Sequence, residues 1–111
     1  MSYSIITTYR FERELKRLAK KYPSLKNEFA ELITQITHNP TTGTFIGNNC
    51  YKIRLAIGSK GKGKSGGARV ITYLYIDTET VYLLSIYDKN EKTDLKPNEL
   101  KEIIDSLALD I

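Results

Sequence analysis

The spacing of apolar residues changes along this chain from a helical period to a strand period, and this change limits the folds that it can adopt. From Phe11 to Tyr22 apolar residues recur at intervals of four, three and four, which predicts a helix ended by Pro23. The apolar stripe of residues 25–36 predicts a second helix, for which Ser24 can supply the N-cap. The first third of the chain is therefore expected to be mostly a pair of helices.

Strand patterns dominate the rest of the chain. The main strand candidates are residues 50–57, 69–76 and 80–87. A short strand is also expected before the helices, at residues 4–7, and a final helix is expected to begin at Pro97. Residues 41–49 are expected to form a loop, and residues 77–79 a short hairpin connection. The order is strand, two helices, three strands and helix, in a single domain that covers residues 1–111.

Composition places this domain among ordinary soluble proteins. The formal net charge is only +4, so the placement of the charges matters more than their sum. Cys50 is the only cysteine, which excludes an intrachain disulfide, favours a reducing cytosol and suggests a small buried side chain. The first residues lack the pattern of a signal peptide, and no apolar run is long enough to span a membrane. A cytoplasmic protein without a membrane partner is predicted.

Basic residues are concentrated in the middle of the chain. Six of them stand between Asn49 and Ile76, with no acidic residue in between: Lys52, Arg54, Lys60, Lys62, Lys64 and Arg69. Such a stretch suits a polyanion, because each cation set against a phosphate releases a condensed counterion. The sequence therefore indicates a nucleic acid as the ligand, which is either held or cut.

Within the glycine- and lysine-rich residues 58–67, Gly58 followed after four residues by Gly63-Lys64-Ser65 matches the letters of a phosphate-binding P-loop. A P-loop opens directly into a helix, whose N-terminus cradles the phosphate. Here the loop leads into Arg69–Tyr73, which has a strand pattern, so nucleotide binding is rejected. One remaining interpretation is a flexible hairpin loop kept soluble by its lysines. We favour a loop that grips RNA phosphates through Lys60, Lys62 and Lys64.

Strand alternation predicts where the other cations point. Lys52 and Arg54 share one face of their strand, opposite to the apolar residues beside them. Like charges on one face add nothing to a structural sheet, although a solvated outer face is the simple alternative. Arg69 begins the next strand and is expected to lean over the same face. Three cations there would form a pocket for a phosphate, or for the charge that develops in phosphoryl transfer.

The residue types that this chain lacks limit the mechanisms by which it could cleave RNA. His38 is the only histidine, which excludes a paired-histidine ribonuclease, and no Cys, His or carboxylate cluster has the spacing of metal ligands. If the protein cleaves RNA, we expect the ribose 2′-hydroxyl to attack the adjacent phosphate, with no metal or other cofactor. A lysine can act as the base only if neighbouring cations lower its pKa, whereas an arginine stays protonated and serves as an electrostatic clamp.

The segment after the third long strand, residues 85–95, carries mixed charges. The simple interpretation is a polar loop. Alternatively, Tyr87 leaves the strand end to stack on a base, while Lys89 and Lys92 extend the cation cluster. The residues alone leave both interpretations open.

In combination these segments resemble the RelE/ParE toxin superfamily, and most closely its HigB-like branch. The resemblance rests on the Lys-x-Arg strand at residues 52–54, on Gly67–Val70 and on Tyr87–Lys92, and it spans nearly the whole chain. It implies the α+β fold of RelE-like microbial ribonucleases, a small antiparallel sheet with two N-terminal helices and a C-terminal helix. It also implies a ribosome-dependent mRNA endonuclease that a cognate antitoxin holds inactive.

The resemblance further implies roles for single residues. Lys52 and Arg54 match the basic strand pair that family members use as base and transition-state stabiliser. Arg69 matches a phosphate-stabilising arginine, and Lys89 falls near the basic position proposed to protonate the leaving group. Leu95 stands near the place where some members have a stacking tyrosine, and the lysine–glycine loop is longer than in the simplest members.

The leading hypothesis is metal-independent cleavage of mRNA in the ribosomal A site, with rRNA, the message and an antitoxin as partners. One alternative is a ParE-like poison of a type II topoisomerase, which acts by protein–protein contact and would arrest replication before translation. The other is an RNA-binding module without catalysis, which would leave transcripts without new 5′ ends.

Overall fold

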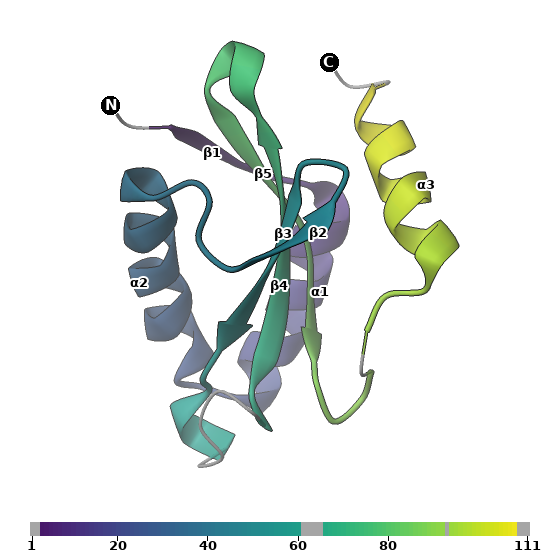
Figure 1. The fold of residues 1–111 in the computed structure, drawn as a ribbon. Helices are drawn as coiled ribbons and strands as arrows, with labels where there is room; N and C mark the ends of the chain where they lie inside the picture. Colours follow the sequence, from purple (N-terminus) through teal and green to yellow (C-terminus); the bar gives the residue numbers. More distant parts are fainter. Residues whose placement is uncertain (1–2, 61–65, 93, 109–111) are drawn as a thin grey trace.

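Five strands form one sheet at the centre of the molecule (Figure 1). The computed structural model describes residues 3–60, 66–92 and 94–108. The strands lie in the order β1-β5-β4-β3-β2, and their bounds are β1 Ser4–Thr7, β2 Thr44–Gly47, β3 Cys50–Leu55, β4 Ala68–Tyr75 and β5 Thr80–Asp88. The antiparallel sheet that the family resemblance implies is confirmed for β2 to β5, whereas β1 runs parallel to β5 as an edge strand.

Three helices cover the two faces of this sheet. Their bounds are α1 Tyr9–Lys21, α2 Leu25–His38 and α3 Pro97–Ala108. In Figure 1, α1 lies behind the sheet, α2 stands at its left, and α3 lies apart from them at the right. All three helices were predicted from the sequence, including the start of α3 at Pro97. None of the described helices has both the length and the apolar character needed to cross a membrane.

The two N-terminal helices begin in different ways. Thr8 caps α1 by accepting a hydrogen bond from the N–H of Phe11 at 3.1 Å. Ser24 occupies the N-cap position of α2, but its side chain makes no capping bond, contrary to the sequence prediction. Its hydroxyl instead donates to the carboxylate of Glu28 and accepts a hydrogen bond from the N–H of Ser59. The start of α2 is therefore tied to the connection that follows β3.

The apolar interior forms two clusters, one on each face of the sheet. The cluster under α1 and α2 is the larger, and side chains such as Phe11, Leu32 and Val70 are completely or almost completely buried in it. The cluster under α3, called here the α3-side cluster, consists of Cys50, Ile71, Leu84, Tyr87, Ile103 and Leu107. Because one short helix covers this second face, polar side chains can reach solvent beside it.

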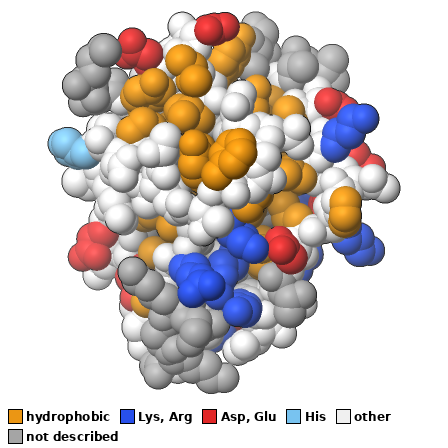
Figure 2. Space-filling model, in the orientation of Figure 1, with side chains coloured by type: hydrophobic (Ala, Val, Ile, Leu, Met, Phe, Trp, Pro, Cys, Tyr) orange, Lys and Arg blue, Asp and Glu red, His pale blue; other side chains and the backbone are white. Residues whose placement is uncertain are grey.

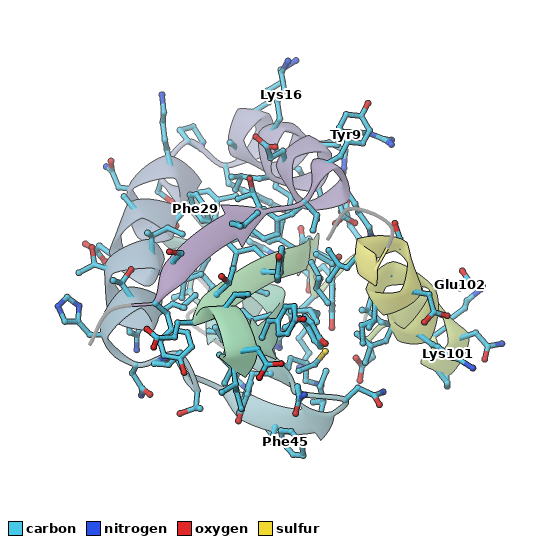
Figure 3. All side chains as sticks on the ribbon, turned by 90° about the horizontal axis from the view of Figure 1, so that it is seen from above. Tyr9, Lys16, Phe29, Phe45, Lys101 and Glu102 are labelled. Atoms are coloured by element: carbon cyan, nitrogen blue, oxygen red, sulfur yellow. The ribbon has the colours of Figure 1, made fainter. Side chains whose placement is uncertain are left out.

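β2 corrects the sequence prediction, which assigned residues 41–49 to a loop. β2 pairs with β3 through the two-residue turn Asn48-Asn49, in which both residues have positive φ, 53° and 59°. Such a turn matches the twist of a hairpin, and asparagine tolerates its backbone well. The strand is short and its side chains are exposed or half-buried, so no alternation marks it in the sequence. Phe45, for example, is 59% exposed and points away from the sheet (Figure 3).

The glycine- and lysine-rich connection leads from β3 to β4. It begins with one 3₁₀ turn, η1 (Gly58–Lys60), and the element that follows it in the described chain is the strand β4. A P-loop would open into a helix here, so its rejection is confirmed. Gly67 is required at the end of the connection, because a Cβ at this position would overlap the carbonyl oxygen of Leu55. Lys62 and Lys64 lie outside the described residues.

Candidate functional site

Three of the predicted cations, Lys52, Arg54 and Arg69, project from one face of the sheet and are called here the strand cations. Arg54 on β3 is the direct partner of Arg69 on β4, and Lys52 is the partner of Ile71. Partners across two strands point to the same side, as do residues two apart in one strand. Ile71 belongs to the α3-side cluster, so this is the face that α3 covers in part. Figure 2 shows this side of the molecule, with Lys and Arg side chains gathered below its centre.

The strand cations differ in their contact with water. Arg54 is exposed, the side chain of Lys52 is 28% exposed, and Arg69 is only 3% exposed. The guanidinium of Arg69 donates through Nη1 to the carbonyl oxygen of Ala68 at 3.1 Å. The prediction that Arg69 shares a face with the other two is confirmed, but its side chain is covered and does not lean over an open surface. Lys52 and Arg54 form the accessible part of the cluster.

Tyr87 is placed differently from its predicted role. It is 4% exposed within the α3-side cluster, so its ring is not available to stack on a base in this arrangement. Its hydroxyl donates to Oδ1 of Asp94 at 3.4 Å, while Nζ of Lys52 lies 3.2 Å from Oδ2 of the same carboxylate. Burial, strengthened by Asp94 and opposed by Arg69, raises the pKa of Tyr87 to about 12. Asp94 therefore joins a buried tyrosine to a predicted catalytic lysine.

Lys60 was predicted to bind RNA phosphates from a flexible loop, but the structure places its amine in a buried ion pair. Its Nζ lies 2.6 Å from Oδ1 of Asp88, and the two side chains are only 4% and 1% exposed. The hydroxyl of Tyr22 donates to Oδ2 of Asp88 at 2.7 Å, and Nζ of Lys60 lies 5.3 Å from the centre of the Tyr22 ring. Burial opposes ionisation of Asp88, but hydrogen bonds from Lys60, Tyr22 and the N–H of Asn90 outweigh it and lower the pKa of the carboxyl. Lys60 is a buried ion-pair partner and offers no grip to RNA.

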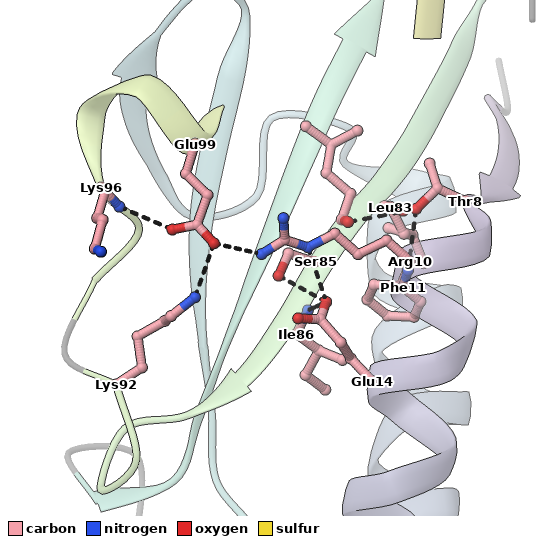
Figure 4. A network of polar contacts seen from close by, with 11 residues as sticks. Thr8, Arg10, Phe11, Glu14, Leu83, Ser85, Ile86, Lys92, Lys96 and Glu99 are labelled. Carbon is pink, nitrogen blue, oxygen red and sulfur yellow. Dashed lines mark hydrogen bonds and ion pairs between the residues drawn. The ribbon is translucent and has the colours of Figure 1, made fainter. Parts of the chain in front are cut away.

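Lys92 belongs to a network centred on Glu99 at the start of α3 (Figure 4). Oε2 of Glu99 accepts hydrogen bonds from Nζ of Lys92 at 2.9 Å and from Nη2 of Arg10 at 2.8 Å, and Oε1 accepts one from the N–H of Lys96. Although burial works against the charged form, these bonds lower the pKa of Glu99 to about 2. Nζ of Lys92 also lies 5.8 Å from the centre of the Tyr87 ring. The network fastens α3 to α1 and to the segment that carries Lys92.

Lys89 stands directly after β5 and close to the start of β4. Its N–H donates to the carbonyl oxygen of Gly67 at 3.1 Å, one residue from the pairing of Ala68 with Asp88. Its side chain is half-buried and forms no ion pair with any described residue. Lys89 therefore lies at the same end of β4 and β5 as Arg69.

The single cysteine and the single histidine take no part in the group of strand cations. Cys50 is fully buried and its burial raises the pKa of the thiol to about 12, so it is a core side chain as predicted. His38 is exposed at the end of α2, where a ring nitrogen lies 2.9 Å from the carbonyl oxygen of Thr34. Within the described ranges, no three His, Cys, Asp or Glu side chains gather as metal ligands would.

Three carboxylates, Asp88, Asp94 and Glu99, are partners of the cations and were not predicted from the sequence. A local signal existed for Asp88, whose Oδ1 accepts the N–H of Asn90 two residues later, as aspartates in turns often do. No local signal pairs Asp88 with Lys60 or Asp94 with Lys52, because these residues are 28 and 42 positions apart. Their meeting depends on the tertiary structure.

Solved structures with a similar fold contain RelE-type toxins. A double mutant of the E. coli toxin RelE in the free state has a TM-score of 0.61 and 17% identity, over 84% of this chain and 90% of that one. A chain of the intact E. coli RelBE toxin–antitoxin complex has a TM-score of 0.60 and 17% identity, over 78% of this chain and 96% of that one. A chain of the toxin–antitoxin complex RelBE2 from Mycobacterium tuberculosis has a TM-score of 0.56 and 16% identity, over 79% of this chain and 99% of that one. At these identities the likeness shows the α+β fold.

The sequence itself gives the family. Residues 8–109 match the family model described as RelE toxin of the RelE/RelB toxin–antitoxin system. This span contains every strand except β1, all three helices and all the cations described above. The matches are to RelE toxins and do not single out the HigB-like branch. With its fold and nearly its whole sequence in agreement, the chain belongs to the RelE family of toxins from toxin–antitoxin systems.

Proposed function

We propose that this RelE-family toxin is an endoribonuclease that cleaves mRNA in the ribosomal A site and so inhibits translation in the cytoplasm. The observation that supports this most is the direct pairing of Arg54 with Arg69 across two strands, with Lys52 on the same face. Like charges placed opposite each other weaken a sheet. A phosphate that gains negative charge in its transition state would account for their arrangement, since fixed cations stabilise such charge strongly.

The proposed reaction uses the ribose as the nucleophile and no metal or cofactor. The 2′-oxygen attacks the adjacent phosphorus, a new P–O bond forms, and the bond from phosphorus to the 5′-oxygen breaks. The products are a 2′,3′-cyclic phosphate and a 5′-hydroxyl. One group accepts the proton of the 2′-hydroxyl, a role that we assign to Lys52, and another donates a proton to the 5′-oxygen, a role that we assign to Lys89. Arg54 stabilises the charge on the phosphate by contact, and Arg69, which is covered in this structure, stabilises it through its own charge from the paired position on β4.

The contact between Lys52 and Asp94 does not close this site. Asp94 has a side chain that is 60% exposed, and ion pairs with such exposure contribute about 0–1 kcal/mol. The 2′-hydroxyl of the substrate can therefore replace the carboxylate at Nζ of Lys52 at small cost. Lys92, with a 34% exposed side chain, borders the same region and is assigned to RNA binding together with Lys62 and Lys64.

Dependence on the ribosome and control by an antitoxin complete the proposal. A site built only from lysine and arginine needs help to orient its substrate, and rRNA can provide it. The E. coli RelBE and M. tuberculosis RelBE2 structures are complexes of toxin with antitoxin. We extend this to the present chain and expect a cognate antitoxin, with acidic side chains that neutralise the exposed cations Lys52 and Arg54.

The test is cleavage of a defined mRNA on purified ribosomes, followed by primer extension. The wild-type protein should create new 5′ ends within the A-site codon, and Arg69→Ala should lower the rate at least about a hundredfold. Arg69→Lys controls for the loss of charge, and Lys16→Ala removes an exposed cation of α1 that points away from the sheet (Figure 3). Undiminished cleavage by folded Arg69→Ala would contradict the role of Arg69. Wild-type protein that leaves every message intact would contradict the proposed function, and replication arrest before translation would favour topoisomerase poisoning.

A further inference from the structure

Asp88 is the centre of a buried polar cluster that no role in RNA binding or catalysis accounts for. Its carboxylate accepts hydrogen bonds from Nζ of Lys60, from the hydroxyl of Tyr22 and from the N–H of Asn90, at 2.6, 2.7 and 2.9 Å. These four residues, Tyr22, Lys60, Asp88 and Asn90, are called here the Asp88 cluster. With side chains 4% and 1% exposed, Lys60 and Asp88 are far more buried than the other ion pairs of the described chain.

The cluster joins three segments that are distant in sequence. Tyr22 follows the last turn of α1, Lys60 ends η1, and Asp88 ends β5. Each segment is also held by its own backbone bonds, such as the bond from the N–H of Lys60 to the carbonyl oxygen of Ile57. The carboxylate of Asp88 is therefore the common point at which the end of α1, the connection after β3 and the end of β5 are fixed to one another.

The same residue shapes the turn that carries Lys89. The carbonyl oxygen of Asp88 accepts the N–H groups of Glu91 and Lys92, both at 3.0 Å, and its side chain accepts that of Asn90. Lys89 lies inside this turn, and its own N–H is bound to the carbonyl oxygen of Gly67. Movement of Asp88 would therefore shift the backbone of Lys89 relative to β4, the strand that begins with Ala68 and Arg69.

We propose that Lys60 and Asp88 are positioning residues, which hold Lys89 in place at the end of β4 that carries Arg69 and do not contact RNA themselves. The proposal rests on the proposed function, because Lys89 has its role only in RNA cleavage. A buried ion pair with unmatched partners is costly, so the pair holds its geometry only while both charges and their hydrogen bonds are present. Catalytic groups lose much of their effect when they are displaced by about 1 Å.

The experiment compares variants in single-turnover cleavage on mRNA-programmed ribosomes, with binding to the same ribosomes measured separately. Asp88→Asn keeps an acceptor for Asn90 and loses the charge. We expect its cleavage rate at saturating ribosomes to fall about tenfold to a hundredfold, while its ribosome affinity stays within about threefold. Tyr22→Phe removes one hydrogen bond to Asp88 and should lower the rate by a smaller factor. It is the variant most certain to fold, so it keeps the test decisive if Asp88→Asn does not.

A double variant separates positioning from a general loss of stability. In the Lys89→Ala background, Asp88→Asn and Tyr22→Phe should cause little further loss of rate, because they act through Lys89. The stability lost in each variant, followed by urea unfolding, should be the same in both backgrounds. Losses of rate that simply multiply in the double variants would overturn the proposal. So would a Lys60→Met protein that cleaves at the normal rate when saturated but binds ribosomes more weakly, because Lys60 would then be an RNA contact.

These outcomes are distinct from failure of the proposed function. If the wild-type protein does not cleave mRNA on ribosomes, there is no rate for Asp88 to influence and the proposed function itself fails. If wild-type protein cleaves and Asp88→Asn and Tyr22→Phe do so equally well, only the positioning role fails.

Discussion

Two lysines of the same basic stretch are each paired with an aspartate, and the comparison separates the structural part of this stretch from the accessible part. Lys60 and Asp88 meet at 2.6 Å with side chains 4% and 1% exposed, whereas Lys52 and Asp94 meet at 3.2 Å with side chains 28% and 60% exposed. Breaking a buried pair leaves an uncompensated charge inside the protein, whereas water replaces the partner in an exposed pair. We therefore expect loss of Lys60 to lower stability far more than loss of Lys52, whose side chain acts directly in cleavage.

The largest effect expected is on stability, at Lys60. Lys60→Met should lower the free energy of unfolding by about 3–5 kcal/mol, because Asp88 would stay buried without its cation. The midpoint of urea unfolding measures this, with Lys52→Met as the matched control, expected within about 0.5 kcal/mol of wild type. Adding Asp88→Asn to Lys60→Met should restore part of the loss. Equal effects of the two lysine variants would remove the contrast between the pairs.

The next effect is on cleavage, at Lys52. Lys52→Ala should reduce the rate of mRNA cleavage on ribosomes about a hundredfold while the free energy of unfolding changes by less than about 1 kcal/mol. Both quantities are measured on the same preparation. Lys16→Ala, which removes an exposed lysine from α1, should leave both unchanged. A loss of activity that only followed a loss of folded protein would reverse the assignment of Lys52.

The Glu99 ion pairs are partly exposed, and we expect them to make the free energy of unfolding depend on pH. The pKa of Glu99 is lowered to about 2 in the folded protein, so its charge contributes stability that is present above its ordinary pKa of 4.5 and is lost as the pH falls towards 2. We expect about 1–2 kcal/mol to be lost in this window, since a side chain 22% exposed is partly screened by water. Urea unfolding at pH 6, 4 and 3 measures it. Glu99→Gln should be less stable than wild type at pH 6, and its free energy of unfolding should change less between pH 6 and pH 3. If its free energy of unfolding falls as steeply with pH as that of wild type, the loss belongs to other carboxylates.

The smallest effect is expected at Asp94. Asp94→Asn should change the free energy of unfolding by less than about 0.5 kcal/mol, because its pair with Lys52 is exposed. Cleavage should stay the same or become about twofold to threefold faster, since a competitor for the substrate is removed from Lys52. The cleavage rates of wild type and Asp94→Asn should converge at high salt, where the ion pair is screened. A cleavage rate that falls tenfold would show that Asp94 supports the site instead of competing for it.

Most elements were predictable because their apolar patterns are local. α1, α2 and the three long strands carry clear periods, and Pro97 marks the start of α3. β2 was missed because its side chains are exposed or half-buried, although the turn Asn48-Asn49 after Gly47 was a usable signal for a hairpin. The capping bond expected of Ser24 is absent, and its hydroxyl oxygen accepts the N–H of Ser59 from a distant segment instead.

The sequence by itself determined which side of a strand each cation faces. Alternation along β3 put Lys52 and Arg54 on one face, and the basic stretch without acids pointed to a polyanion. The tertiary structure alone decided which of these charges are available. It brought Asp88 to Lys60 and Asp94 to Lys52 from 28 and 42 residues away, and it buried Arg69 as well as Tyr87, which lies in the α3-side cluster. The physical reason is that side-chain direction follows from local backbone geometry, whereas burial and charge pairing depend on segments that meet only when the chain has folded.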